Sequence, residues 1–433
     1  MSKMTIEQMK QLACEAIDRN ADKIIAIAED IFVEPELGYK EFKTAAKVKK
    51  VFEELGIEYQ DEVAITGVIG KAEGGQHNAK IAVMGELDAV VCPGHRCADP
   101  VTGAAHSCGH HAQIASLVGV AYALKESGIL PELGGDVALM AVPAEEGVEL
   151  EYRNELMQQG KISYLGGKQE FIKLGVFDDV DAMIMQHTIG GTKSYAGGPG
   201  GMGFVAKIIQ YRGVESHAAS PHEGINALDA AKIGLMACDC LRSTFRDEDG
   251  IRFHPIITKG GSLVNVVPAF VQIETFVRGY TTEAIMDASA KVDRALKAGA
   301  DALGATCDIY NLPGYLFSVE APDLKEVVEG NMREIFGADN VIKGSGFTTE
   351  ANDVSNIIPT VHSMICGSEG VGHSSNYEIA NKQTAYIDSA KLLVTSVIDL
   401  LANGAEKAIE IKKNFKAPLT KESYIQLMEE MRS

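Results

Sequence analysis

Four short runs of apolar residues predict the central strands of one domain. They cover residues 81–84, 137–142, 182–185 and 360–366. Unbroken apolar runs are typical of parallel strands buried on both faces, because a strand with one face in water alternates apolar and polar residues. Helical spacing of apolar residues occurs around these runs, over residues 6–30, 41–55 and 113–127 and from residue 387 onward. The pattern predicts an α/β domain with a mostly parallel sheet and helices on both faces, onto which the last helices pack back.

The middle of the chain follows a different order. A glycine-rich breaker at residues 197–203 precedes it, and Pro313-Gly314 marks its end. Between them the pattern predicts a strand, a helix, two strands, a helix and a strand, at residues 204–211, 225–241, 251–257, 271–280, 282–303 and 306–311. This βαββαβ order is that of the ferredoxin-like unit. We therefore expect a small domain at residues 200–314, inserted into a larger one made of residues 1–199 and 315–433.

Composition excludes some classes of partner. The length of 433 residues suits two domains, and 46% hydrophobic with 23% charged residues is ordinary for a globular protein. The net charge of −20 argues against nucleic acid and anionic membranes, because there is no basic surplus to neutralise phosphates. We find no signal-like N-terminal segment and no apolar run near the ~18 residues of a membrane span. The eight cysteines are scattered along the chain, which is typical of reduced thiols and not of a disulfide framework. We therefore expect a cytoplasmic protein.

Each predicted strand of the larger domain leads to a residue that can bind a metal or move a proton. Asp88 follows the first strand, Glu145-Glu146 the second and His187 the third, and His373 lies in a glycine-rich loop after the fourth. In open α/β sheets, ligands bind beyond the carboxyl ends of the strands. This regularity predicts an active site at that edge of the sheet.

The densest cluster of candidate ligands is HSCGHH at residues 106–111. Cys108 and His110 are good ligands for zinc and similar ions, and Gly109 lets the backbone bend between them. The alternative is a buried cysteine beside surface histidines. The pair Glu145-Glu146, unless it is a solvated acidic turn, needs a cation or a shared proton, because adjacent carboxylates repel. One glutamate can then bind a metal while the other takes a proton from the attacking water.

The separate histidines complete the set of donors. Taken singly, His187 and His373 are more often structural residues than ligands. Together with Cys108 and the other candidates they give five or six donors, whereas one catalytic zinc-like ion takes about three protein ligands. We therefore expect two divalent ions that share a hydroxide. Asp88 suits a hydrogen bond that orients a ligand histidine, with a turn or helix-capping aspartate as the alternative.

The pattern of motifs resembles metallopeptidase family twenty, which holds aminoacylases, carnosinases and plant auxin-conjugate hydrolases. It is most similar to the amidohydrolase branch with the p-aminobenzoyl-glutamate hydrolase subunits. The similar segments follow the family order along nearly the whole chain: 35–41 (PELGYKE), 85–89 (GELDA), 106–110 (HSCGH), 143–147 (PAEEG), 181–187 (DAMIMQH), 213–219 (GVESHAA), 265–268 (NVVP) and 372–373 (GH).

The resemblance implies roles for the matched residues of the larger domain. It implies that Glu145 is the general base and acid. It also implies five ligands of two divalent metal ions, namely Cys108, His110, Glu146, His187 and His373.

For the inserted domain, the resemblance implies a lid that also forms the dimer, so that we expect a homodimer or a larger homo-oligomer. His217 resembles the lid histidine that stabilises the developing oxyanion, often across the dimer. Asn265 and Arg278 resemble lid residues near the polar end of the substrate. A forked contact from Arg278 to a substrate carboxylate is physically reasonable, and a surface strand arginine is the alternative.

Two features depart from the family pattern. His111 stands where many members of the branch have an aspartate, which puts one contact behind or between the metals in doubt. The loop at residues 92–100 is longer than usual, so that His95 or Cys97 could line the pocket, with an ordinary surface loop as the alternative.

These observations predict a metal-dependent hydrolase that cleaves the amide bond of N-acyl or N-aroyl amino acids or of small dipeptide-like substrates. Zinc, manganese, cobalt and nickel all suit the expected ligands. Two alternatives stay open. One is a cysteine hydrolase with Cys108 as its nucleophile, and the other is a non-catalytic binding protein of the same fold.

Overall fold

The computed structural model describes residues 4–198 and 201–432, which form two units. The first unit contains Met1–Val148, Gly166–Pro199 and Val319–Lys421, and the second contains Glu149–Leu165, Gly200–Ser318 and Glu422–Ser433. The expected insert, residues 200–314, lies within the second unit. Its expected boundary falls on residues 199 and 200, outside the described part of the chain.

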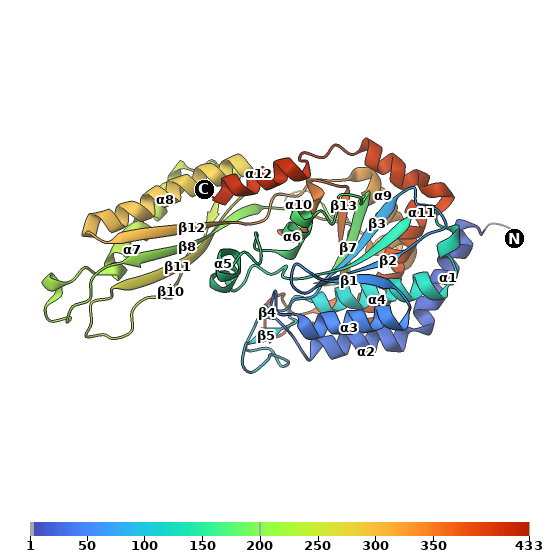
Figure 1. The fold of residues 1–433 in the computed structure, drawn as a ribbon, viewed down its shortest axis with the longest axis horizontal. Coiled ribbons are helices and arrows are strands. Elements are labelled where there is room, and N and C mark those ends of the chain that lie inside the picture. Colours follow the sequence, from blue (N-terminus) through green and yellow to red (C-terminus); the bar gives the residue numbers. More distant parts are fainter. Residues whose placement is uncertain (1–3, 199–200, 433) are drawn as a thin grey trace. The chain divides into compact units, whose positions relative to one another are not determined.

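A seven-stranded sheet forms the centre of the first unit (Figure 1). Four strands run parallel in its middle, and antiparallel strands close both edges. In order across the sheet the strands are β1 (Glu58–Val63), β2 (Gly67–Ala72), β6 (Asp136–Val142), β3 (Lys80–Glu86), β7 (Ala182–Gly190), β13 (Thr360–Glu369) and β14 (Glu378–Ile379). The parallel strands β6, β3, β7 and β13 are the four predicted from apolar runs, which confirms the α/β class.

Helices cover both faces of this sheet (Figure 1). On one face, α4 (His110–Glu126) and α11 (Ser389–Asn414) pack against each other and against the central strands. Residues 110–124 of α4 are all buried, because small and apolar residues surround almost the whole helix. On the other face, α6 (Gly167–Leu174) and α10 (Ala351–Ser355) pack together. The strands are therefore buried on both sides, as their unbroken apolar sequences require.

The first helical stretch, expected as one continuous pattern, is divided into two helices. Instead of a continuous pattern over 6–30, the chain forms α1 (Ile6–Arg19) and α2 (Ala21–Phe32). Asn20 separates them, and its side-chain amide donates to the carbonyl of Ala16 at 3.0 Å. Asparagine competes for backbone hydrogen bonds in this way and so interrupts helices. The next helix, α3 (Phe42–Glu54), agrees with its prediction within one residue.

Several elements of the first unit were not predicted. Strands β1 and β2 were not predicted. For β1 the reason is that its residues are mostly polar and exposed, as in an edge strand. The short strands β4 (Val90–Val91) and β5 (Ala104–Ala105) pair with each other and enclose the long loop between them. The helices α9 (Pro322–Phe336), α6 and α10 were also not predicted, although α9 has a proline in its first turn and buried apolar residues four positions apart at Leu324, Val328 and Met332.

The second unit has the predicted βαββαβ order. Its main sheet is antiparallel, and across it the strands are β10 (Ile256–Lys259), β11 (Phe270–Gly279), β8 (Gly203–Arg212) and β12 (Thr306–Pro313). The helices α7 (Ala227–Cys240) and α8 (Thr282–Leu303) pack against each other and on this sheet. Outside this core, the unit also contains α5 (Leu150–Gln158).

The strand expected at residues 251–257 is interrupted. Residues Arg252–Phe253 form β9 and residues Ile256–Lys259 form β10, and both pair with β11, with a shift of register between Ile257 and Lys259. Pro255 lies between them and has no N–H to donate to the ladder, so the pairing lapses at that point.

The last helix corrects a prediction. The helices after residue 387 were expected to pack back on the larger domain, and α11 does so. Helix α12 (Lys421–Arg432) instead groups with the second unit, where the buried ring of Tyr424 contacts that of Tyr164 at 6.3 Å between centroids. Apolar spacing revealed the helix but not its partner, because the spacing does not say which surface a buried face contacts.

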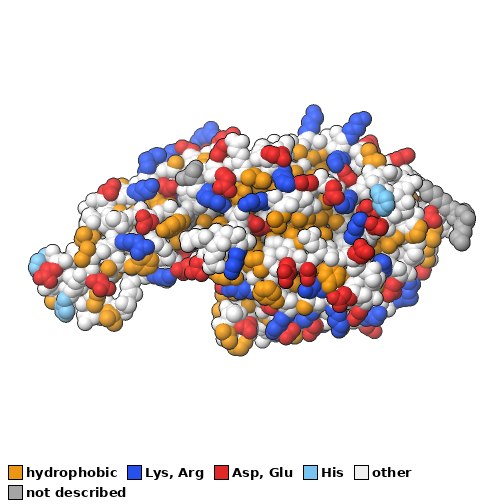
Figure 2. Space-filling view, viewed as in Figure 1, with side chains coloured by type: hydrophobic (Ala, Val, Ile, Leu, Met, Phe, Trp, Pro, Cys, Tyr) orange, Lys and Arg blue, Asp and Glu red, His pale blue; other side chains and the backbone are white. Residues whose placement is uncertain are grey.

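The surface mixes charges of both signs. On the face drawn in Figure 2, Lys and Arg side chains lie between Asp and Glu side chains. In the part of the chain that the structure describes, no helix is both long and apolar enough to cross a membrane.

Candidate metal centre

Most of the predicted residues of the first unit line one pocket near the carboxyl ends of the parallel strands. The pocket has a volume of about 330 Å³. Its walls include candidate ligands from four separate segments, together with apolar and hydroxyl side chains. Among the lining residues are Cys108, Glu145, Glu146, His187, Phe347, Met364, His373 and Tyr377.

A tight turn places Cys108 directly before α4. The turn passes through Gly109, whose φ of 93° lies in the left-handed region. A Cβ at this position would lie 2.2 Å from the hydroxyl oxygen of Tyr377 and 2.3 Å from that of Thr188. Only glycine fits both the conformation and the space, so the spacing of the two ligand candidates depends on it.

The five predicted ligands form two groups that share one sulfur. In the first group, the ligand atoms of Cys108, His110 and His187 all lie within 4.8 Å of one another, and in the second those of Cys108, Glu146 and His373 do. The Cys108 Sγ lies 3.2 Å from Nε2 of His187 and 3.2 Å from Nε2 of His373. A thiolate between two sets of donors can serve two neighbouring cations, since thiolate and imidazole are both good ligands for zinc-like ions.

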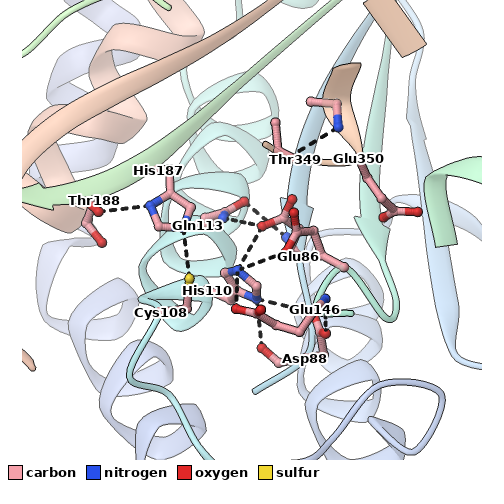
Figure 3. A network of polar contacts seen from close by, with 12 residues as sticks. Glu86, Asp88, Cys108, His110, Gln113, Glu146, His187, Thr188, Thr349 and Glu350 are labelled. Atoms are coloured by element: carbon pink, nitrogen blue, oxygen red, sulfur yellow. Dashed lines mark hydrogen bonds and ion pairs between the residues drawn. The ribbon is translucent and has the colours of Figure 1, made fainter. Parts of the chain in front are cut away.

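Two of the histidines are oriented by backbone carbonyls. Nδ1 of His110 lies 2.9 Å from the carbonyl oxygen of Asp88 and 3.2 Å from its carboxylate (Figure 3). Nδ1 of His187 lies 2.8 Å from the carbonyl oxygen of Thr188. A carbonyl can only accept, so each Nδ1 carries a proton, and the neutral form of each imidazole has its lone pair on Nε2. This tautomer is the one that a metal ligand needs.

Asp88 also reaches a second element of the centre. Its other carboxylate oxygen accepts the backbone N–H of Glu146 at 2.9 Å. The buried carboxylate of Asp88 thus contacts both the imidazole of His110 and the backbone of Glu146.

The charges of the cluster fit a cation. Burial and Glu146 act to raise the pKa of Cys108, but the imidazoles of His187 and His110 bring it down to about 6. Burial acts to lower the pKa of His187, whereas the thiolate of Cys108 raises it to about 9. Hydrogen bonds to Cys108 and Glu146 raise the pKa of His373 to about 11. The anionic donors therefore attract protons to the imidazoles, and divalent ions can take the place of those protons.

Glu145 has a different environment from Glu146. Its carboxylate lies 4.0 Å from Nε2 of His110, and its side chain is 12% exposed. Burial, together with the charges of Glu86 and Glu146, raises the pKa of Glu145 to about 8. Burial also acts to raise the pKa of Glu146, but the hydrogen bond and charge of His373 lower it to about 2. Two carboxylates with separated pKa values suit two different roles.

A buried network of ion pairs and hydrogen bonds lies around Glu86, and the sequence did not predict it. The carboxylate of Glu86 lies 3.0 Å from Nε2 of His110, and its other oxygen accepts from Nζ of Lys168 at 2.6 Å. Gln113 donates to Glu86 at 2.6 Å (Figure 3), and the Lys168 ammonium also lies 3.4 Å from Glu350. Lys168 is fully buried. Glu86, His110 and Glu145 form a third group of possible metal-binding atoms within 4.8 Å.

The only sequence signal for this network is the position of Glu86 at a strand end. Lys168 and Glu350 lie in segments without apolar periodicity, and the pairs join positions 82 and 182 residues apart. Separations of this size leave no local pattern, so the ion pairs become visible only in the fold.

His111 points away from the ligand groups. Its ring is buried and contacts the ring of Phe32 at 4.9 Å, that of His106 at 5.4 Å and that of Tyr386 at 5.9 Å between centroids. Burial and the charge of His110 lower the pKa of His111 to about 3. The histidine thus lies among rings in the protein interior, where it is neutral.

The predicted residues of the second unit lie in a separate region of the chain. His217 and Asn265 are both exposed and occupy neighbouring segments, joined by a hydrogen bond from the Ala218 N–H to the Asn265 carbonyl at 2.9 Å. Nδ1 of His217 accepts the N–H of Ala219 at 3.0 Å, so a neutral His217 carries its proton on Nε2.

Arg278 stacks on two rings of its own sheet. Its guanidinium carbon lies 5.1 Å from the ring centroid of Phe204 and 5.0 Å from that of Phe276. Stacking holds the guanidinium plane in one orientation and leaves its edges able to donate hydrogen bonds. Burial lowers the pKa of Arg278.

A protein-family model matches this chain over residues 82–398, and its description is peptidase family M20/M25/M40. The matched region includes all five ligand candidates and most of the second unit.

Two curated relatives illustrate the likeness. The Xaa-Arg dipeptidase of Mus musculus is 26% identical over 97% of this chain and 95% of its own length. The IAA-amino acid hydrolase ILR1-like 4 of Arabidopsis thaliana is 28% identical over 74% of this chain and 71% of its own length.

Two solved structures share the fold. A dinuclear metal-binding M20 peptidase from Bacillus subtilis has a TM-score of 0.60 at 20% identity, over 88% of this chain and 98% of its own. The aminobenzoyl-glutamate utilization protein of Klebsiella pneumoniae has a TM-score of 0.67 at 17% identity, over 89% of this chain and 97% of its own.

Proposed function

The chain belongs to peptidase family M20/M25/M40, and we propose that it is a two-metal amidohydrolase of N-acyl or N-aroyl amino acids or of small dipeptide-like substrates. The resemblance to metallopeptidase family twenty is thereby confirmed, and with it a hydrolase of amide or peptide bonds. The substrate class, the ligand set and the roles below are part of the proposal.

One observation carries the proposal: two groups of donor atoms meet at the single sulfur of Cys108. We assign one ion to Cys108, His110 and His187, and the other to Cys108, Glu146 and His373. When bound, two divalent ions such as Zn²⁺, Mn²⁺, Co²⁺ or Ni²⁺ acidify a water and polarise a carbonyl oxygen. The orientation of His110 and His187 through their Nδ1 atoms supports this assignment.

Glu145 is assigned the proton transfers. Its carboxylate takes a proton from the water as the water attacks the amide carbonyl carbon. The amide C–N bond then breaks, and Glu145 delivers the same proton to the departing amine nitrogen. Its position near Nε2 of His110, and its place in the pocket wall, support this role. Asp88 is assigned the orientation of His110.

The second unit supplies the remaining roles. His217 donates from Nε2 to the oxygen that becomes negative in the tetrahedral intermediate. Asn265 and Arg278 bind the polar end of the substrate, with the planar guanidinium suited to a carboxylate. The exposure of His217 and Asn265 within their own unit supports a role toward a substrate.

The shape of the pocket supports a small acyl or aminoacyl group. About 330 Å³ is enough for one such group, and Phe347, Met364 and Tyr377 provide apolar and aromatic walls. The names of the two relatives refer to a dipeptide and to an amino-acid conjugate, both of which place an amide next to an amino-acid carboxylate.

Two further proposals concern assembly and location. We propose a homodimer or larger homo-oligomer built through the second unit, because the strand β10 lies at the edge of its sheet with Ile256 and Ile257 exposed. We also propose a cytoplasmic location.

A hydrolysis screen tests the proposal. N-acyl and N-aroyl amino acids and dipeptides are offered to protein stripped with a chelator and resupplied with single defined metals. We expect release of the amino acid only after metal is returned. Activity that survives thorough metal removal would favour a cysteine hydrolase that uses Cys108. Stoichiometric metal without hydrolysis across the panel would favour a binding protein of the same fold.

A further inference from the structure

The long loop before the cysteine motif has a role that the proposed function leaves unassigned. Of the described residues that line the pocket, none comes from residues 92–103, so neither His95 nor Cys97 forms its wall. We propose that this 92–103 loop holds the segment that carries His373, and that His95 is the positioning residue. The inference rests on the proposed role of His373 as a metal ligand.

His95 makes a buried hydrogen bond to the segment of His373. The side chain is 5% exposed, and its Nε2 lies 2.9 Å from the carbonyl oxygen of Tyr377. The backbone N–H of Cys97 donates to Nδ1 of His95 at 3.2 Å. Nδ1 is therefore the acceptor, Nε2 carries the proton, and Nε2 donates to Tyr377. Cys97 thus determines the tautomer that makes the contact possible.

The segment that His95 contacts needs to be held. His373 has a φ of 63°, a left-handed conformation that costs energy for a residue with a side chain. Its N–H donates to the carbonyl of Ser107 at 2.8 Å, beside the cysteine motif. The Tyr377 hydroxyl lies 2.6 Å from that of Thr188, which follows His187. The segment 373–377 is thus attached at both ends to the metal centre, and His95 fixes the carbonyl of its last residue.

The 92–103 loop is itself rigid enough to act as a support. It leaves the β4–β5 ladder and closes on itself through hydrogen bonds between the backbones of Cys92 and Gly103 at 2.8 Å and of Asp99 and Ala104 at 2.8 Å. The Asp99 carboxylate accepts two further N–H groups and the Thr102 hydroxyl within it. The ring of Phe32 packs edge-on against His95 at 5.6 Å between centroids.

A second contact from the same loop gives a matched comparison. Arg96 pairs with Glu378 at 3.3 Å, but both side chains are more than half exposed, at 62% and 51%. Exposed ion pairs contribute little. We therefore expect the buried hydrogen bond of His95, and not the ion pair of Arg96, to hold the segment that carries His373.

The experiment measures metal affinity, not turnover. Chelator-stripped full-length protein is titrated with Mn²⁺ by calorimetry, and bound metal is counted by elemental analysis. We expect two ions on the wild type, and about 10-fold weaker binding of one of them in His95→Ala, since residues that orient ligands typically contribute 10–100-fold. His95→Gln, whose amide can donate to Tyr377 and accept from Cys97, restores most of the affinity. Arg96→Ala and the exposed His77→Ala stay within about twofold.

The second variant guards against a folding defect. His95→Leu keeps apolar bulk against Phe32 but removes both hydrogen bonds, and it is expected to weaken the same ion as His95→Ala. Wild-type affinity for both ions in His95→Leu overturns the inference while leaving the proposed function intact. Fewer than two ions on the wild type overturns the proposed function, and the inference with it.

Discussion

The two units place their candidate residues in opposite environments. In the first unit, Cys108, His110 and Glu146 are held in a buried network and reach one another within a few ångströms. In the second unit, His217 and Asn265 are exposed, and Arg278 is stacked on rings of its own sheet. The first set forms a complete constellation within one unit. The roles proposed for the second set all concern the substrate, so the two sets need different tests.

The largest effect is expected at Glu145. We predict that Glu145→Gln lowers kcat by about 10²–10⁴-fold, because the amide cannot accept the proton of the attacking water. Metal content should stay at the wild-type value, since Glu145 is not assigned as a ligand. Steady-state kinetics and elemental analysis of the same preparation check both parts. A near-normal rate would remove Glu145 from its role.

His217 tests the second unit. We predict that His217→Ala lowers kcat by about 10²–10³-fold, as expected for loss of one donor to the oxyanion. Metal affinity and KM should change little, which distinguishes this residue from those of the first unit. His222→Ala, an exposed histidine of the same unit, is the control. If both substitutions had the same small effect, the oxyanion role would be wrong.

A change at Glu86 tests whether the buried network of the first unit contributes to metal binding. We predict that Glu86→Gln weakens binding of the ion at His110 by about 10–100-fold, because a carboxylate 3.0 Å from Nε2 of His110 becomes neutral. Competition with a chromogenic chelator measures the change. Glu378→Gln, a surface glutamate, should bind metal as the wild type does. Equal affinities in the two variants would show that the network has only a structural role.

Arg278 is expected to give the smallest effect. We predict that Arg278→Lys raises KM for substrates with a free carboxylate by about 10-fold and leaves kcat nearly unchanged, because lysine keeps the charge but not the planar fork. The corresponding substrate amides should show no such difference. A KM that rises equally for acid and amide would point to disturbed packing against Phe204 and Phe276.

Much of the first unit could be predicted because its strands are buried on both faces. Such strands read as unbroken apolar runs, and their carboxyl ends locate the site. The strand β1 was missed because an exposed edge strand carries polar residues, and Pro255 interrupted a strand that spacing alone read as continuous. The helix α12 was recognised, but its partner surface was not.

The candidate site divides in the same way. Motif spacing was enough to single out Cys108 and His110, because a short turn joins them. Lys168 and His95 could not be assigned, since each acts through a partner in a distant segment, Glu86 for the first and Tyr377 for the second. Local sequence reports the groups that a turn or strand presents, whereas a contact between distant segments appears only once the chain has folded.

The central claim is that two cations share the sulfur of Cys108, and metal counting on the Cys108→Ala variant tests it most directly. We predict two divalent ions on each chain of metal-loaded wild type, and loss of both from Cys108→Ala after dialysis, because each group keeps only two protein donors. In His187→Ala, one ion should remain. Retention of both ions by a folded Cys108→Ala variant would contradict the account.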